Sequence, residues 1–204
     1  MTSMTASPTH SLPLSSPRAQ ILVGVALAAL MIATRGQHFA TIDRLPSASW
    51  AIFFLAGALL RLMWMLPLLF VLASLLDIVS LASGTIGDWC LSPAYWALAP
   101  AYATLWLAGH FYARIHRDRW TTLPRLALVL AVAAFATYVF SGGGFYFFSG
   151  RYPDPTLAGF AARIGQYYPR SLGTLAGYVG TAFALLAIVR GIGALRTAQQ
   201  GARA

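Results

Sequence analysis

Residues 50–83 read WAIFFLAGALLRLMWMLPLLFVLASLLDIVSLAS, an apolar stretch interrupted by one arginine and one aspartate. As a single helix it would extend about 50 Å at 1.5 Å per residue, against a membrane hydrocarbon core of about 30 Å. It must therefore break. Arg61 and Pro67 indicate where, because a charge prefers the membrane interface and a proline removes a helix hydrogen bond. The stretch predicts two membrane helices, over about residues 48–60 and 63–83.

Further apolar segments lie on both sides of this pair. They predict spans over residues 19–34, 94–112, 123–140 and 171–189. Residues 141–170 contain a run of three glycines followed by Pro153 and Pro155, and they predict a connection with a short amphipathic helix over 156–168.

The expected fold class is an all-α integral membrane protein with a bundle of six transmembrane helices. Residues 1–18 are rich in Ser, Thr and Pro and predict a disordered tail. A single six-helix membrane domain is expected over residues 19–195, followed by a second tail over 196–204. A cleaved signal peptide competes for residues 19–34, but the preceding tail is long and no clear cleavage site follows.

The composition agrees with a membrane protein. The chain is 58% hydrophobic and 9% charged, and its mean hydropathy is +0.67. The formal charge of +9 raises the alternative of a nucleic-acid partner. The arginines stand at the ends of apolar segments and do not follow one face, so no nucleic-acid partner is predicted.

The distribution of arginine predicts the topology. Nine arginines precede the first span, follow the last, or lie in the second-to-third and fourth-to-fifth connections: Arg18, Arg61, Arg114, Arg117, Arg119, Arg125, Arg190, Arg196 and Arg203. Because positive loops stay on the cytoplasmic side, both termini are expected in the cytoplasm. The segments that carry His38, Cys90 and Arg163 are then expected at the outer face.

Polar chemistry gathers in residues 77–95, DIVSLASGTIGDWCLSPAY, which hold the sole cysteine of the chain. A single cysteine excludes an intramolecular disulfide and a CxxC site. Cys90, beside Asp88, is a candidate soft ligand for a metal, and the alternative is a small buried apolar residue. Asp77 near the end of an apolar span predicts a partner or a function, because a carboxylate there is costly.

Three more outer residues are candidates, each with a plain alternative. His38 is either a ligand or an interfacial hydrogen-bonding residue, and Tyr95 is either functional or part of the aromatic belt. Arg163 would bind an amide, phosphate or carboxylate in a pocket, or otherwise balance Asp154 or face headgroups. Cys90 and His38 alone make an incomplete zinc site. A metal held inside a macrocycle would need just one axial protein ligand.

Three segments resemble a known family: HFATIDRLPSASWAIFFLAG (residues 38–57), GDWCLSPAY (residues 87–95) and GRYPDPTLAGFAARIGQYYP (residues 150–169), together with Asp77. They are similar to the solitary cobalamin-specific S-components of the energy-coupling-factor (ECF) transporter type, the BtuM-like proteins. The resemblance covers nearly the whole chain after the tail. It implies a six-span transporter that takes up cobalamin across the bacterial inner membrane and binds it at the outer face.

The same resemblance implies the site. Cys90 matches the cysteine that ligates cobalt, and His38, Asp77, Tyr95 and Arg163 match the polar residues grouped with it. It also implies cysteine-dependent removal of cyanide from cyanocobalamin. Whether cobinamide is bound as well is left open by the sequence. Coupled members present small residues of the first helix to an ECF coupling module, and Gly24, Ala28, Ala29 and Ala33 suit that contact. Solitary members are implied to act without the module, and this chain contains no P-loop for ATP.

Two other functions remain open from the sequence. One is a membrane enzyme that mainly processes corrinoids or another metallated macrocycle. The other is a non-catalytic membrane subunit in which Cys90 is a packing residue.

Overall fold

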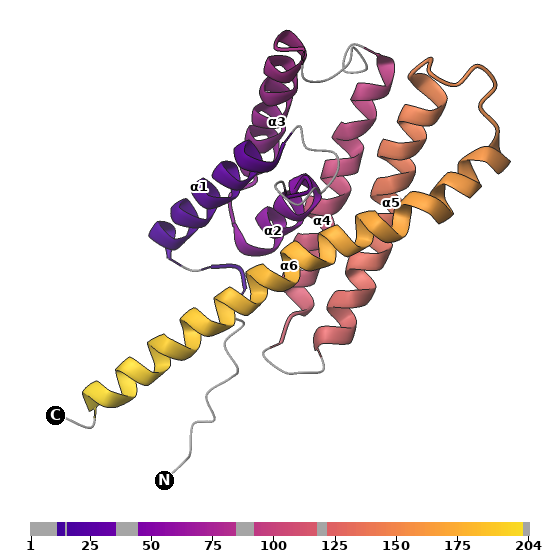
Figure 1. Ribbon diagram of the computed structural model, residues 1–204. Coiled ribbons are helices and arrows are strands. Elements are labelled where there is room, and N and C mark those ends of the chain that lie inside the picture. Colours follow the sequence, from indigo (N-terminus) through magenta and orange to yellow (C-terminus); the bar gives the residue numbers. More distant parts are fainter. Residues whose placement is uncertain (1–11, 15, 36–44, 85–91, 118–121, 202–204) are drawn as a thin grey trace.

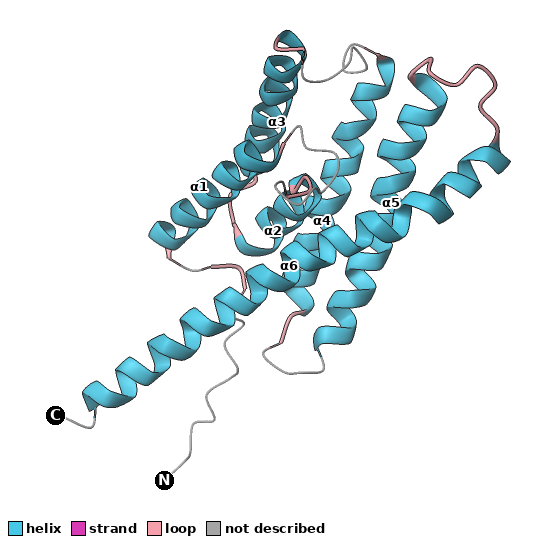
Figure 2. Ribbon diagram, in the orientation of Figure 1, coloured by secondary structure: helices cyan, strands magenta, loops and turns pink. Residues whose placement is uncertain are grey.

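Helices are the regular secondary structure in the part of the chain that the structure describes, and loops join them (Figures 1 and 2). A computed structural model describes residues 12–14, 16–35, 45–84, 92–117 and 122–201. The elements follow in the order α1 (Pro17–Thr34), α2 (Ser49–Leu59), α3 (Met65–Ala82), η2 (Pro93–Ala97), α4 (Leu98–Ile115), α5 (Thr122–Phe148) and α6 (Leu157–Gly201).

Four of the described helices are long and apolar enough to cross a membrane: α1, α3, α5 and the 157–193 part of α6. Large apolar side chains on these helices are exposed, as Ile21, Leu68, Val132 and Leu185 show. Exposed apolar side chains on helices of this length are typical of a lipid-facing surface. The chain is therefore a membrane protein with an all-helical fold.

Helix α2 agrees with the predicted bounds of residues 48–60 to within one residue at each end, but it is short and lies inside the bundle. It has 11 residues, which corresponds to about 16 Å of helix and is about half the thickness of the hydrocarbon core. Nearly all its residues are buried, and it packs against α1, α3, α4 and α6. A helix that is apolar on every side belongs in the interior of a bundle, and α2 is the central helix of this one.

The predicted break at Arg61 and Pro67 is confirmed. Helix α2 ends at Leu59 and α3 begins at Met65, which places Pro67 in the first turn of α3, where a missing N–H costs least. The side chain of Gln20 bridges this connection. Its carbonyl accepts from the Arg61 N–H at 3.1 Å, and its amide donates to the Leu14 carbonyl at 2.9 Å.

Residues 12–14, which lie in the predicted disordered tail, pack against the bundle. Leu12 is buried in the core, and the Leu14 N–H donates to the Leu59 carbonyl at 3.0 Å. Helix α1 then begins with Ser16 as its N-cap and Pro17 as its first residue, a common helix start. The prediction of disorder rested on the overall composition of the tail. It did not take into account its few apolar side chains, such as Leu12, which can pack against the bundle.

The connection predicted over residues 141–170 is much shorter in the structure. Helix α5 continues through the three glycines to Phe148, and the 156–168 helix is the first part of α6, which runs on through Pro169. A Cβ at Gly144 would overlap the side chain of Ala97, so the absent side chain serves close packing of α5 against η2. Proline is tolerated within membrane helices, which accounts for Pro169.

The ends of the helices fall into two groups. The C-terminal ends of α1, α3 and α5 meet the N-terminal ends of α2, α4 and α6, since successive helices alternate in direction (Figure 1). Helix α6 crosses the others obliquely, and its C-terminal part extends away from them. The polar site described next lies where α1 ends and α2 begins.

Candidate functional site

A buried ion pair joins the end of α1 to α3. The Nε of Arg35 donates to Oδ1 of Asp77 at 2.8 Å, and its Nη2 donates to Oδ2 at 2.5 Å. The two side chains are 7% and 6% exposed. Two parallel bonds between a guanidinium and a carboxylate are the strongest arrangement for such a pair, and here it is shielded from solvent.

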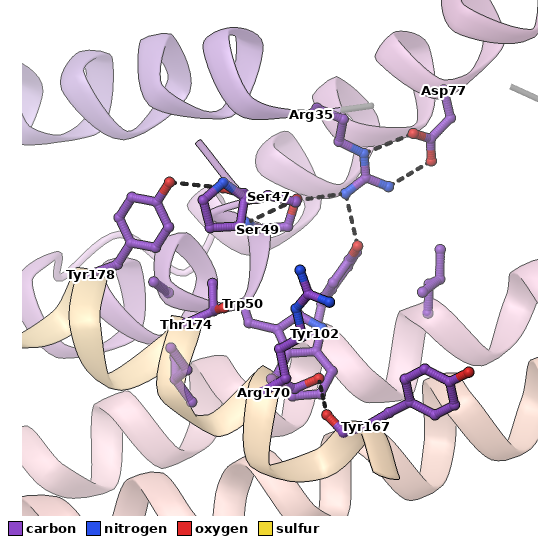
Figure 3. A pocket seen from close by; sticks show the side chains of 15 residues that line it. Arg35, Ser47, Ser49, Trp50, Asp77, Tyr102, Tyr167, Arg170, Thr174 and Tyr178 are labelled. Carbon is purple, nitrogen blue, oxygen red and sulfur yellow. Dashed lines mark hydrogen bonds and ion pairs between the residues drawn. The ribbon is translucent and has the colours of Figure 1, made fainter. Parts of the chain in front are cut away.

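Three hydroxyl groups complete the contacts of this pair (Figure 3 shows the pair with Ser49 and Tyr102). The Nη1 of Arg35 donates to Ser49 Oγ at 3.0 Å and to the Tyr102 hydroxyl at 2.8 Å. On the other side, the Tyr95 hydroxyl donates to Asp77 Oδ2 at 3.0 Å. One charged pair thus connects α1, α2, α3, η2 and α4.

Each partner has a local reason for its position. Arg35 is the C-cap of α1, and Ser49 is the first residue of α2. Tyr102 is held by ring stacking on Phe53, with centroids 4.2 Å apart. Burial raises the pKa of Tyr95 to about 12, so its hydroxyl stays protonated and donates to Asp77 at ordinary pH.

A cavity of about 310 Å³ lies beside the ion pair, between α2, α4 and α6. Arg35 and Asp77 form one part of its wall, and Arg170 and Thr174 line it from α6 (Figure 3). The first residues of α2 complete it, together with Tyr102. A cavity of this size is at the lower limit for ligand pockets, which range over about 300–1,000 Å³.

Arg163 lies in a second, aromatic environment. Its guanidinium carbon is 5.6 Å from the ring centroid of Tyr146, 4.8 Å from that of Tyr152 and 5.1 Å from that of Tyr167. Faces of aromatic rings stabilise a cation at these distances. Tyr167 also lines the cavity, so this aromatic cage borders the ion-pair site.

The structure brings together two of the five predicted site residues. Asp77 and Tyr95 are in direct contact, and Arg163 lies in the neighbouring cage. His38 and Cys90 fall outside the described residues, as does Asp88. Within the described ranges, no group of three His, Cys, Asp or Glu side chains is placed to hold a metal ion.

Sequence reasoning missed Arg35, Ser49 and Tyr102. Arg35 looks like an ordinary charged residue at the end of a span. A usable signal exists nonetheless, since a buried carboxylate such as Asp77 needs a cation. The arginines predicted on the same side are Arg35, Arg44, Arg151, Arg163 and Arg170, and Arg35 is the one that ends a neighbouring span.

Comparison with known proteins leaves this geometry as the main basis for a functional argument. The chain matches no protein-family model and has no significant similarity to a curated protein.

Proposed function

We propose that this protein is a cobalamin-binding membrane transporter that takes up the vitamin across the bacterial inner membrane. The observation that carries the proposal is the contact between Asp77 and Tyr95. The sequence resemblance predicts these two residues for the same site, and they come from α3 and η2, the elements on either side of Cys90. The Arg35 ion pair fixes both of them at one end of the bundle.

In this proposal Cys90 is the axial ligand of the cobalt. The thiolate is the ligating form, so the thiol loses its proton as the sulfur–cobalt bond forms. With cyanocobalamin, the bond between cobalt and cyanide breaks, and the released cyanide takes up a proton. This is a ligand exchange without a change in oxidation state, and it makes decyanation a by-product of binding.

The remaining polar residues would hold the periphery of the corrinoid. His38 and Arg163 would do so through hydrogen bonds to the amide groups around the ring, and Asp77 and Tyr95, which bond to each other, would tune the Cys90 thiol. The cavity is far smaller than a corrinoid, so the ring would lie over it and one peripheral arm would enter. The described contacts support this placement of the ring and the arm, because the Arg35–Asp77 pair forms a rigid part of the cavity wall.

The proposal includes six membrane crossings with both termini in the cytoplasm. Helices α2 and α4 would complete the six, α2 as a short internal crossing. The arginines at the ends of α4 and α5, among them Arg114 and Arg125, support a cytoplasmic location for that side. Small residues of α1 leave room for an ECF coupling module, although the protein would act alone if it resembles the solitary members.

The direct test is the visible absorption spectrum of protein purified from cells grown with cobalamin. We expect the wild type to carry bound cobalamin with a thiolate–cobalt signature, and to release cyanide from cyanocobalamin. Cys90→Ala should lack both the signature and the release of cyanide. Arg125→Gln, which alters an exposed side chain near the N-terminal end of α5, is the matched control and should behave as the wild type.

Transport needs its own measurement. Uptake of labelled cobalamin in cells that lack other routes should depend on the protein. A colourless wild-type protein that supports no uptake would refute the proposal, whereas decyanation without uptake would favour an enzyme over a transporter.

A further inference from the structure

The wall of the cavity beside Arg35 presents hydrogen-bond donors and few acceptors. Tyr102 and Ser49 each accept a bond from Arg35, so their own hydroxyl hydrogens must point elsewhere. Ser47 and Ser49 share one bond at 3.0 Å, which uses one of their two hydrogens. Within the described chain, no acceptor is found for the second hydrogen or for the Tyr102 hydrogen.

Thr174 adds a further donor from α6. This half-buried residue lines the cavity, and its hydroxyl makes no hydrogen bond to the described residues, whereas Thr181 on the same helix donates to the Gly177 carbonyl at 2.9 Å. The side chains of Ser49 and Tyr102 are both nearly fully buried. Hydroxyl donors without a protein acceptor in the wall of a cavity favour a ligand that supplies acceptor atoms.

The Asp77 carboxylate in the cavity wall has little remaining capacity to accept hydrogen bonds from a ligand. Asp77 accepts two bonds from Arg35 and one from Tyr95, so its oxygens are already engaged. A second guanidinium, that of Arg170, also lines the cavity. The wall is therefore suited to oxygen atoms of a ligand and disfavours amines.

The direction of α2 adds to this preference. Its first residues, Ser49, Trp50 and Ala51, line the cavity, so the N-terminal end of the helix faces it. The first N–H groups of a helix have no carbonyl partner within the helix, and this end carries partial positive charge. Anionic oxygens bind at such ends more favourably than neutral ones.

We propose that the cavity between α2, α4 and α6 is a binding site for a phosphodiester group. Under the proposed function, on which this identification of the source rests, the group is the phosphodiester in the nucleotide arm of cobalamin. Cobinamide lacks that arm and would leave the cavity without its anion. A lipid headgroup is the other source of the same chemistry, and the experiment separates the two.

The test compares the two corrinoids in dodecyl maltoside, a detergent without phosphate. Thr174→Val keeps the shape of the side chain and removes a donor, and Thr181→Val is the matched control outside the cavity. We expect Thr174→Val to raise the Kd for cobalamin about tenfold, the loss of one bond to a charged group, and to leave the Kd for cobinamide within about twofold. Thr181→Val should change neither value.

A second probe keeps the inference independent of corrinoid binding. Dimethyl phosphate, a soluble phosphodiester, should change the fluorescence of Trp50 in the wild type and not in Trp50→Phe, and Thr174→Val should need higher concentrations. If phosphatidylcholine abolishes this response and corrinoids do not bind, the phosphodiester site stands, its occupant is a lipid, and the proposed function has failed. The inference is overturned if Thr174→Val weakens both corrinoids equally, or if dimethyl phosphate has no effect on the wild type.

Discussion

Replacing Asp77 by asparagine tests whether the buried ion pair stabilises the contact between α1 and α3. The asparagine keeps one oxygen that can accept from Arg35, but its amide presents N–H groups to a guanidinium that itself only donates. The guanidinium retains its bonds to Ser49 and Tyr102 and remains buried without a counter-ion. Removal of one partner from a buried pair costs about 3–5 kcal/mol, and we expect a loss of that size.

The free energy of unfolding is measured by titrating SDS into mixed micelles and following helicity by circular dichroism. Asp154→Asn is the control, since it removes an exposed carboxylate and should change the free energy by about 0.5 kcal/mol or less. The double variant Arg35→Met/Asp77→Leu removes both charges, and it should recover most of the loss because an apolar pair avoids the desolvation cost. A value for Asp77→Asn within about 1 kcal/mol of the wild type would refute the reasoning.

Three further predictions concern close packing at Gly109, the Tyr95 hydroxyl and the aromatic cage of Arg163. A Cβ at Gly109 would overlap the Phe54 carbonyl oxygen, so Gly109→Ala should lower the free energy of unfolding by about 1–3 kcal/mol, whereas Gly177→Ala, with open space around it, should not. The pKa of Tyr95 is raised to about 12 by burial, so its stabilisation is present below pH 10.0 and is lost as the pH rises toward 12; the stability difference between the wild type and Tyr95→Phe should shrink over that range. Arg163→Gln should destabilise the protein by about 1–2 kcal/mol through lost cation–π contacts, and Arg125→Gln, at an exposed position, should have no measurable effect.

Much of the fold follows from segment length and the position of charges. The break between α2 and α3 is predictable because about 50 Å of apolar helix cannot fit a membrane of about 30 Å. The central position of α2 is not predictable in the same way, because the same apolar side chains are found on helices that face lipid and on helices that are buried among other helices. The three glycines before Phe145 indicate a loop in isolation, but they lie within α5, where Gly144 packs against Ala97 and Gly143 against Phe160.

The candidate site is predictable to a similar extent. The cost of a carboxylate in an apolar span points to Asp77, whereas Tyr95 is indicated by the resemblance of residues 87–95 to the BtuM-like proteins. Arg35 is lost among 14 arginines, most of which set the topology. Its role depends on Asp77, which is 42 positions away in the sequence, and no local sequence pattern predicts a contact between residues so far apart.

Arg35 in the cavity wall and Arg163 in the neighbouring aromatic cage show different ways to keep a cation within an apolar bundle. Arg35 has a carboxylate and two hydroxyls, which neutralise its charge and use four of its five N–H donors. Arg163 has three aromatic faces, which stabilise its charge without neutralising it. The Arg35 pair therefore fixes structure, because any displacement would uncover a buried charge. Arg163 keeps a net charge that attracts an anionic or amide group, which makes it the better suited of the two to meet a ligand directly.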